Sequence, residues 1–325
     1  MFMKSAFLRV ISCVVASVLL LAAGFSANDA YDVSEPENCL LHFSVVSDTH
    51  IEGNNFARYQ VFARAMQDVR KNKSGNDAIV FLGDSTMNGQ QIESMLFYGT
   101  LGLVLKNENI INVMGNHDIG NGEGDFKTLQ KRWYGYNSAF TGRTLEHPYF
   151  YDVICGCYFI VLGMESQEVH EMLMTEEQFA WLENVLESAS GSGKPVFVFS
   201  HYPSDYVIDE SGEETDRLTR LFADYNREHD LFSFVGHTHM PMYLFWSFHT
   251  SDGFPETYLP RLTQLSGSHD NEPYDDTGVG LVVEVYENKV VLRGRDFYRG
   301  EWKYDTVDDT MCEVTYELKH PFQPA

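Results

Sequence analysis

The stretch Phe43-Ser44-Val45-Val46-Ser47-Asp48-Thr49-His50 joins a short apolar run to side chains that commonly bind metals. We expect the run from Phe43 to Val46 to form a buried strand, because apolar runs of roughly four to eight residues are typical of strands covered on both faces. Asp48 and His50 then lie just past the carboxyl end of this strand. Open α/β sheets bind their ligands at that end, so the stretch predicts an α/β fold with a ligand site at this loop.

The same arrangement, an apolar run followed by a polar cluster, occurs four more times along the chain. Because each cluster follows a predicted parallel strand, we expect all five loops to converge on one edge of one sheet. The further runs and clusters are Ile79–Leu82 before Gly83-Asp84, Ile110–Met114 before Gly115-Asn116-His117-Asp118, Val196–Phe199 before His201, and Phe232–Val235 before Gly236-His237-Thr238-His239.

The side chains in these clusters favour particular metals. Carboxylate, imidazole and amide oxygen ligands suit manganese, iron(II) or zinc, and the clusters contain no thiolate. They also offer more ligands than one ion needs. With this many ligands, one carboxylate can bridge two ions about 3.5 to 4 Å apart, a spacing that holds both the attacking and the leaving oxygens of a phosphoryl transfer.

Taken in order, the clusters match the pattern D-x-H, G-D, G-N-H-D/E, a lone H and G-H-x-H. From about Leu41 to His239 the chain therefore resembles the calcineurin-like metallophosphoesterase superfamily. The resemblance implies an α/β fold in which two mixed β-sheets pack face to face and helices flank them, an α/β/β/α sandwich. It also implies an enzyme that uses two divalent metal ions, manganese, iron or zinc, to hydrolyse a phosphate ester.

The resemblance assigns roles to individual residues. A hydroxide that bridges the two ions would be the nucleophile, because coordination to metals lowers the pKa of water towards neutrality. The first ion would bind Asp48, His50 and His239, the second would bind Asn116, His201 and His237, and Asp84 would bridge the two ions.

His117 and Asp118 would be the catalytic pair. In the resemblance His117 is not a ligand: it stands over the phosphate and either stabilises its charge or protonates the leaving alkoxide as a general acid. Asp118 would orient the His117 ring and raise its pKa, as a carboxylate partner does.

Each cluster taken alone has an ordinary structural explanation. Asp-x-His and Gly-Asp are common in turns and helix caps. A non-hydrolytic metal-binding extracellular protein on the same fold is therefore the alternative to an enzyme. Every ligand of the pattern is present, which argues against a degenerate copy of the site.

The first residues predict export. Lys4 and Arg9 precede an uncharged stretch that ends in small side chains near Ser26, as in a secretory signal peptide. We therefore divide the chain into a signal peptide over residues 1–26, a linker over 27–38 and a metallophosphoesterase domain over 39–325. An uncleaved membrane anchor is the alternative. Either outcome places the enzyme outside the cytoplasm, secreted or otherwise extracytoplasmic.

Composition limits the partners. The chain has 325 residues, of which 44% are hydrophobic, and a formal net charge of -24. Such an acidic protein repels polyanions, so nucleic-acid polymers are poor partners, and membrane contact is expected only through an uncleaved signal segment. Four cysteines follow the predicted signal peptide, and the sequence leaves their pairing open: Cys39, Cys155, Cys157 and Cys312.

Periodicity predicts further elements. Thr175 with Gln178 predicts a capping box at the start of a helix. Glu287-Asn288 joins two strand-like runs into a hairpin that we expect in a second sheet, and Cys155-Gly156-Cys157 predicts another hairpin turn. Amphipathic helices are expected over residues 56–69, 175–186 and 218–225, and hairpin strands over 149–154 with 158–162 and 280–286 with 289–295.

The clusters do not fit the better-defined branches of the superfamily. No arginine closely follows Gly83-Asp84, as one does in protein Ser/Thr phosphatases, and Met87 stands where purple acid phosphatases have a tyrosine. Ile119-Gly120 follows the third cluster, where cyclic-nucleotide phosphodiesterases of bacterial type often have an acidic or polar residue and arginine. The chain thus resembles a generic exported, bacterial-type member.

The expected substrate is a small phosphate ester. We favour a phosphodiester over a phosphomonoester, because the motif loops carry no arginine to clamp a dianion and the two metals readily hold a monoanion. The glycine-rich loop over residues 120–124 is either a mobile wall of the site or an ordinary surface loop. Further candidates for substrate contact are Tyr136, Asn137, Arg143, Tyr202 and His269.

Overall fold

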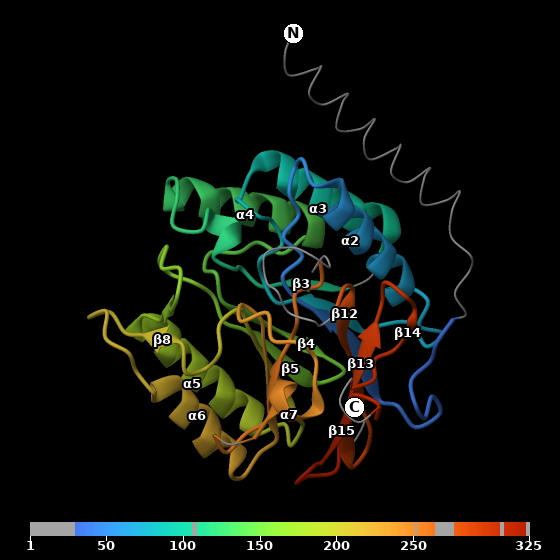
Figure 1. Ribbon diagram of the computed structural model, residues 1–325. Helices are drawn as coiled ribbons and strands as arrows, with labels where there is room; N and C mark the ends of the chain where they lie inside the picture. The colour runs from blue at the N-terminus through green and yellow to red at the C-terminus, as the bar shows by residue number, and fades with distance from the viewer. Residues whose placement is uncertain (1–29, 106–108, 251, 264–275, 306–308, 323–325) are drawn as a thin grey trace.

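The computed structural model of the chain (Figure 1) describes residues 30–105, 109–250, 252–263, 276–305 and 309–322. The predicted signal peptide and His269 lie outside these residues. None of the helices within these ranges combines the length and the apolar character that a membrane span requires.

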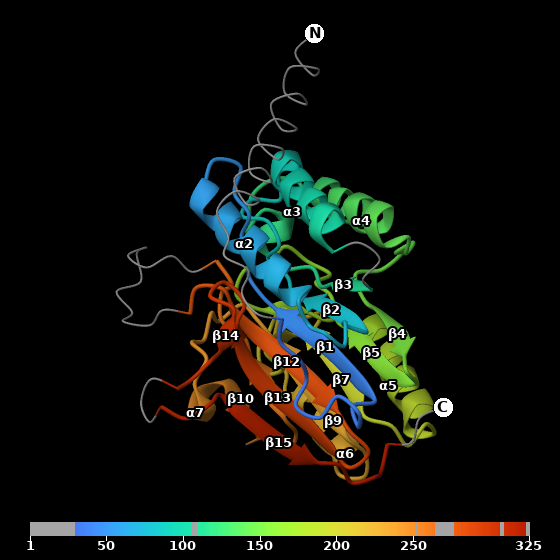
Figure 2. The ribbon, with the colours of Figure 1, turned by 90° about the vertical axis from the view of Figure 1, so that its right-hand side faces the viewer.

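The first sheet is built around β1 (Leu41–Val46), the strand predicted from the opening stretch. β1 pairs in parallel with β2 (Ala78–Phe81), which pairs in parallel with β3 (Ile110–Asn112). All three are buried along their whole length, as expected for apolar strands covered on both faces. The strand order is β14-β13-β12-β1-β2-β3, with β15 also paired to β13 (Figure 2). The remaining strands are β12 (Val279–Val285), β13 (Lys289–Asp296), β14 (Glu301–Trp302) and β15 (Glu313–Glu317).

The hairpin through Glu287-Asn288 is present, but the sheet predicted for it is wrong. β12 pairs antiparallel with β13 and also antiparallel with β1, in a register that sets Leu41 opposite Val285. The hairpin therefore extends the first sheet instead of belonging to a second one. Every residue of β12 is buried, so its sequence lacks the alternation that could indicate which neighbour it joins.

The second sheet has the strand order β10-β11-β9-β7-β5-β4. Its four central strands are parallel, and β4 and β10 pair antiparallel at the two edges. The turn Cys155-Gly156 between β4 and β5 has φ angles of 51° and 84°, as a two-residue hairpin turn requires. Among the described residues, no disulfide joins any of Cys39, Cys155, Cys157 and Cys312. The strands are β4 (Phe150–Ile154), β5 (Cys157–Val161), β7 (Val196–Ser200), β9 (Leu231–Val235), β10 (Phe248–His249) and β11 (Glu256–Tyr258).

The five polar clusters come from both sheets, not from one sheet as predicted. β1, β2 and β3 lead into the first three clusters, whereas β7 and β9 lead into His201 and Gly236–His239. Buried strands of either sheet have the same apolar composition, so the sequence does not separate them. The site therefore lies where the carboxyl ends of two packed sheets meet.

The space between the sheets is filled by apolar side chains around Phe43 of β1. Its ring centroid lies 4.9 Å from that of Phe159 and 5.0 Å from that of Phe197, both with edge-on geometry. Phe199 and Phe234 of the second sheet lie at 6.0 and 6.1 Å. This packing fixes β1 against β7 and β9, and so fixes the loops that follow them.

Helices cover the outer faces and confirm the α/β/β/α sandwich (Figure 1). α2 and α3 pack on the first sheet, α5 and α6 pack on the second, and α4 contributes side chains to both of these packing layers. The helices are α2 (Phe56–Val69), α3 (Gln91–Val104), α4 (Phe126–Thr141), α5 (Glu176–Ser190), α6 (Arg217–Asn226), α7 (Leu244–Ser247) and the 3-10 turn His117–Ile119; β6 (Met172–Leu173) and β8 (Val207–Ile208) form a separate pair.

The predicted capping box of α5 is only half formed. The Thr175 hydroxyl accepts a hydrogen bond from the Gln178 N–H at 3.2 Å, as predicted. The Gln178 side chain instead bonds the backbone of Gly163, and the Glu165 carboxylate accepts from the Thr175 N–H at 2.9 Å. A carboxylate from a neighbouring loop thus takes the place of the local partner.

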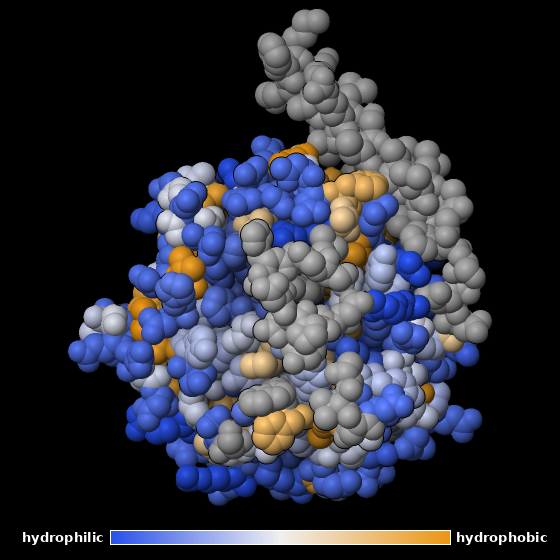
Figure 3. Space-filling view, in the orientation of Figure 1, coloured by the Kyte–Doolittle hydropathy of each residue, from blue (hydrophilic) through white to orange (hydrophobic). Residues whose placement is uncertain are grey.

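The face shown in Figure 3 is mainly hydrophilic where the described residues form its surface, in keeping with the net charge of -24. Large apolar side chains that are exposed lie on different elements, among them Leu103 on α3, Val153 on β4 and Phe245 on α7. Scattered exposure of this kind is ordinary for globular proteins.

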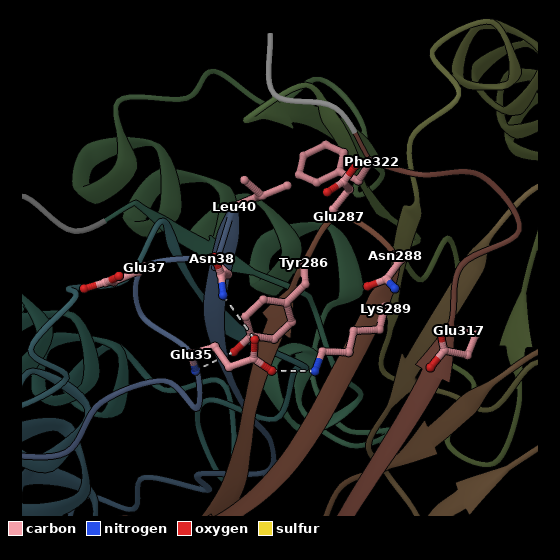
Figure 4. A pocket seen from close by; sticks show the side chains of 10 residues that line it. All are labelled: Glu35, Glu37, Asn38, Leu40, Tyr286, Glu287, Asn288, Lys289, Glu317 and Phe322. Atoms are coloured by element: carbon pink, nitrogen blue, oxygen red, sulfur yellow. Dashed lines mark hydrogen bonds and ion pairs between the residues drawn. The ribbon is translucent and has the colours of Figure 1, made fainter.

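The segment predicted as a linker packs against the first sheet in its described part. Tyr31 and Val33 are buried, and the Arg295 guanidinium lies 3.7 Å from the Tyr31 ring centroid. Further along, Glu35 pairs with Lys289 at 2.6 Å inside a polar groove at the amino end of β1 (Figure 4). This groove contains none of the predicted ligands, which follow the opposite end of that strand.

Replacing Phe43 with alanine should lower the free energy of unfolding by about 3–5 kcal/mol, because it empties a fully buried site between the sheets. Leu103→Ala, on the exposed side of α3, is the matched control and should change it by less than about 0.5 kcal/mol. Urea unfolding monitored by tryptophan fluorescence measures both. Equal losses for the two variants would contradict the packing role of Phe43.

Candidate dinuclear metal centre

Most of the predicted ligands lie on backbone that is uncommon for non-glycine residues. Asp48, His50, Asp84, His237 and His239 have φ angles of 53°, 39°, 50°, 62° and 52°. This left-handed region costs an L-residue roughly 1–2 kcal/mol, and such strain collects at functional sites, where the surrounding structure imposes it. The loops are therefore held in shapes that direct these side chains to one place.

Asp48 divides its two carboxylate oxygens between support and binding. Oδ2 accepts hydrogen bonds from the Ser47 hydroxyl at 2.5 Å and from the His237 N–H at 3.2 Å. Oδ1 faces His239 Nε2 at 3.0 Å and His50 Nε2 at 3.3 Å. These two imidazole nitrogens are themselves 3.2 Å apart, so three donor atoms surround one point.

Asp84 divides its oxygens in the same way and joins two groups of donors. Oδ1 accepts a hydrogen bond from the His117 N–H at 2.8 Å. Oδ2 lies 3.5 Å from His50 Nε2, which belongs to the first group, and 3.3 Å from His201 Nε2, which belongs to the second. This oxygen therefore occupies the position that a bridging ligand needs.

The second group contains His201, Asn116 and His237. His201 Nε2 lies 3.0 Å from Asn116 Oδ1, and its Nδ1 pairs with the Leu82 carbonyl at 2.8 Å. That pairing fixes the ring and leaves Nε2 for the site. The His237 ring lies beside it, with 5.2 Å between the ring centroids.

Asn121 supports this group, although the sequence did not single it out. Its Oδ1 accepts a hydrogen bond from Asn116 Nδ2 at 2.8 Å, which turns Asn116 Oδ1 towards His201. Asn121 has a φ of 52°, a conformation in which asparagine is enriched. The loop over residues 120–124 thus holds a ligand in place, a use that neither predicted role for it included.

Two glycines are required by the closeness of the loops. A Cβ at Gly115 would overlap the Asp84 side chain, and one at Gly236 would overlap the Ser47 hydroxyl and lie 2.7 Å from Asp48 Oδ2. Any side chain at either position would push apart the carboxylates on which the site depends. This explains why glycine stands in front of the polar residues of these clusters.

The charges in the site are set by burial and by mutual contact. Burial acts to raise the pKa of Asp48, but His239 and His50 hold it well below its ordinary range. Burial also acts to raise the pKa of Asp84, but His201 and the neighbouring histidines outweigh it and lower that pKa. Burial lowers the pKa of His50 to about 3. Both carboxylates are thus ionised and His50 is neutral at pH 7.

His201 and His237 differ in their protonation. Burial acts to lower the pKa of His201, but Asp84 outweighs it and raises this pKa to about 9. Burial, together with the charge of His201, lowers the pKa of His237 to about 4. His201 therefore carries the proton that a cation would displace.

The donor set fits divalent metal ions. Ligand atoms of Asp48, His50, Asp84 and His239 all lie within 4.8 Å of one another and could hold an ion. Neighbouring ligands around a metal with bonds of about 2.1 Å lie roughly 3.0–3.4 Å apart, which is close to the donor spacings here. His201, Asn116 and His237 adjoin this group through Asp84, so the residues present suit two ions.

His117 stands at the edge of the donors. Its Nε2 lies 4.0 Å from Asp84 Oδ2, and its ring centroid lies 4.6 Å from that of His50. Its Nδ1 pairs with the Met87 carbonyl at 2.7 Å. Because Nδ1 is taken, Nε2 is the nitrogen that faces the site.

Asp118 does not orient His117 as predicted. Its carboxylate accepts hydrogen bonds from the N–H groups of Ser85, Thr86 and Gly115 and from the Thr86 hydroxyl, and the Met87 carbonyl holds the His117 ring instead. Burial, helped by the Asp84 charge, raises the pKa of Asp118 to about 7. The residue ties the second cluster to the third, so its role is to position loops.

The other predicted substrate contacts are mostly structural. Tyr136 stacks on Tyr98, and Asn137 is fully buried and bonds the backbone of Asn112. Arg143 pairs with Asp152. Tyr136 and Asn137 lie on α4 and Arg143 lies just after it, and these contacts occupy the three side chains.

Tyr202 does lie at the site, with its ring centroid 4.2 Å from that of His237. It is fully buried, however, and its hydroxyl donates to the Val169 carbonyl at 2.9 Å, so it supports His237 from behind. The sequence did not single out Tyr206, whose partly exposed ring lies 6.4 Å from that of His237.

Fold and site together define a metal-dependent phosphoesterase. Residues 41–241 match the family model of the calcineurin-like phosphoesterases, which covers more than half of the chain. The protein belongs to this family and is a hydrolase of phosphate esters. No curated protein sequence matches the chain.

Solved structures share the fold at low sequence identity. A dimetal phosphatase from Danio rerio matches with a TM-score of 0.55 and 14% identity, over 87% of this chain and 100% of that one. A purple acid phosphatase from yellow lupin (Lupinus luteus) seeds matches with a TM-score of 0.58 and 14% identity, over 85% of this chain and 53% of that one.

Asn121→Ala should weaken binding of the second metal ion by about 10- to 100-fold, because it removes the group that orients a ligand. Asn184→Ala, on the exposed side of α5, is the matched control and should bind metal like the wild type. Titration of metal-free protein with manganese measures both. Unchanged affinity in Asn121→Ala would show that Asn116 needs no such support.

Metal affinity should rise with pH up to about pH 9 and then level off. The pKa of His201 is raised to about 9 in the metal-free protein, so below that pH an ion must displace a proton from it. Calorimetric titration with manganese in buffers of different ionisation enthalpy counts the protons released. Affinity that is constant between about pH 7 and 9, with no proton release, would contradict this account of His201.

Proposed function

We propose that the protein hydrolyses a small phosphate ester with two divalent metal ions and with His117 as the group that acts on the leaving oxygen. The observation that carries the proposal is the position of Asp84 Oδ2, between His50 Nε2 at 3.5 Å and His201 Nε2 at 3.3 Å. An oxygen shared by two groups of ligands suits a pair of ions. When bound, the ions would activate water and neutralise phosphate charge.

The chain's own residues would hold the reactants. Asp48, His50 and His239 would bind one ion, and Asn116, His201 and His237 would bind the other. The Leu82 carbonyl holds the His201 ring, and Asn121 holds the Asn116 amide. Four of these ligands are buried and two, His237 and His239, are partly exposed. The substrate phosphate would then be presented to His117, whose Nε2 faces the same side of Asp84.

His117 would carry the proton for the leaving group. Its Nδ1 donates to the Met87 carbonyl, so Nε2 carries a proton in the imidazolium form of the ring. In that form Nε2 would give its proton to the departing alkoxide and leave the ring neutral, or would stabilise the negative charge on the phosphate. A positioned general acid contributes about 10²- to 10⁴-fold to the rate. Asp118 has no direct part in this step, because its oxygens are occupied by the cluster loops.

The preference between esters follows from the charge around the site. A phosphodiester is favoured if no arginine reaches the phosphate, as the motif loops alone indicate. Arg261 lies outside those loops but pairs with Ser47, next to a predicted ligand. If its guanidinium reaches the phosphate, the preference changes from a phosphodiester to a phosphomonoester. The net charge of -24 continues to disfavour nucleic-acid polymers as substrates.

The compartment is part of the proposal. Residues 1–26 have the pattern of a secretory signal peptide, which supports a secreted or otherwise extracytoplasmic enzyme. Intact-mass analysis of protein exported from the native cell is the test. A mature chain that begins near Ala27 supports cleavage, and recovery of the uncleaved chain in membranes would support an anchor instead.

His117→Ala should keep both metal ions and lose about 10²- to 10⁴-fold in kcat. The loss should be larger for esters with poor leaving groups, because these depend most on protonation. The measurement is a series of aryl phosphate esters at saturating manganese, with His147→Ala, an exposed histidine, as control. Equal losses across the series would assign His117 to charge stabilisation instead.

A metal-resolved screen tests the proposed activity as a whole. Metal-free protein reloaded with manganese, iron(II) or zinc is assayed on chromogenic phosphomonoesters and phosphodiesters. Activity that depends on metal and disappears in Asp84→Ala is the expected result. Metal binding without hydrolysis of any ester would contradict the proposal.

A further inference from the structure

Residues 259–263 cross from one sheet to the other at the metal centre. The Leu259 N–H donates to the Val235 carbonyl at 2.8 Å, directly before Gly236 and His237. The Leu262 N–H donates to the Ser47 carbonyl at 3.0 Å, directly before Asp48. The segment therefore spans the two loops that supply Asp48 and His239.

Thr263 fixes the far end of this crossing. Its hydroxyl donates to the Thr49 carbonyl at 2.8 Å, so the segment is bonded on both sides of Asp48. Arg261 forms an isolated parallel bridge with Ser47. An arginine thus stands in register with the residue that precedes a predicted metal ligand.

The Arg261 side chain projects towards the side of the segment that holds the ligands. Leu262 is fully buried in the cluster beneath α2 and α3, on the outer face of the first sheet. Residues paired across a β-bridge point their side chains to the same face, so Arg261 points to the face of its bridge partner, Ser47. Ser47, its bridge partner, directs its hydroxyl to Asp48 Oδ2 on that face.

The Arg261 guanidinium lies close enough to His50, in the first group of donors, to interact with it electrostatically. Arg261 as a whole is partly exposed, and its Nε and Nη2 atoms are shielded from solvent. Guanidinium groups match phosphate oxygens with two parallel hydrogen bonds.

We propose that Arg261 binds the non-bridging oxygens of the substrate phosphate and selects for a phosphate with two negative charges, as in a monoester, over the single charge of a diester. This specificity role rests on the proposed function, because it concerns the substrate of the same site. A monoester carries its second charge above about pH 6, so the distinction holds at neutral and higher pH. Arg261 lies more than twenty residues beyond the last motif cluster, which is why the motif loops gave no sign of it.

The test compares 4-nitrophenyl phosphate with methyl 4-nitrophenyl phosphate, which share a leaving group and differ in phosphate charge. With manganese-loaded protein at about pH 8, where the monoester is a dianion, Arg261→Gln should lose about 10- to 100-fold in kcat/KM on the monoester, as for a lost hydrogen bond to a charged group. The loss on the diester should be below about threefold, because the diester carries only one negative charge and so interacts less strongly with the arginine. Arg261→Lys should recover part of the monoester activity.

A binding measurement makes the result independent of turnover. Inorganic phosphate, a dianion at that pH, is titrated into the manganese-loaded protein by calorimetry, with dimethyl phosphate as the monoanion. Arg261→Gln should weaken phosphate about tenfold or more and leave dimethyl phosphate nearly unchanged. Arg220→Gln, an exposed arginine paired with Asp216 on α6, is the matched control and should behave like the wild type.

The outcomes separate the two claims. If the wild type hydrolyses neither ester but Arg261→Gln still weakens phosphate, the proposed function fails and the role of Arg261 stands. If the wild type hydrolyses the esters and Arg261→Gln loses equally on both, with phosphate binding unchanged, the role of Arg261 is overturned. Manganese content and the thermal unfolding midpoint are measured for each variant, and a variant that loses its metal is replaced in the comparison by Arg261→Lys, which should show the same selective loss to a smaller degree.

Discussion

Two buried carboxylates, Asp48 and Asp84, each give one oxygen to a supporting hydrogen bond and the other to the imidazoles. Asp48 is fixed by the Ser47 hydroxyl and Asp84 by the His117 N–H. Both are almost completely shielded from water, and a buried charge without a partner is costly. The histidines from four loops, and the cations that the site suits, offset that cost, so the arrangement of every loop depends on these two side chains.

The scaffold makes this concentration of charge possible. Strands of both sheets end beside one another because Phe43 is locked among phenylalanines of the opposite sheet. The same packing holds five predicted ligands in the left-handed region, a strain that isolated loops would relieve by relaxing. Gly115 and Gly236 let the loops approach until the carboxylates share a space. The packed core thus holds the ligand side chains in their positions at the site.

Much of this arrangement could be predicted from sequence, because the information is local. Each apolar run predicts a buried strand, and each polar cluster directly follows one. The ligands and their location at the strand ends can therefore be predicted from the sequence. Membership in a sheet is not local. The strands before His201 and Gly236 belong to a different sheet from β1, and β12 joins β1 instead of a second sheet, although nothing in their apolar composition distinguishes them.

The partners of individual side chains also could not be predicted from the sequence. Asp118 follows His117 in the sequence, but its carboxylate turns to Ser85, Thr86 and Gly115, and the Met87 carbonyl reaches His117. Asn121 reaches the site through a hydrogen bond from Asn116 within the same loop. Arg261 reaches it through a β-bridge to Ser47, which is far away along the chain. Such contacts are made by the folded backbone, so a pattern of neighbours along the chain does not reveal them.

The most direct test of the dinuclear account is a crystal structure of manganese-loaded protein with anomalous diffraction at the manganese edge. The account predicts two peaks about 3.5 to 4 Å apart, with Asp84 Oδ2 bound to both, His50 and His239 bound to one ion, and His201 and Asn116 bound to the other. A single peak, or two peaks of which only one is bound to Asp84, would contradict it.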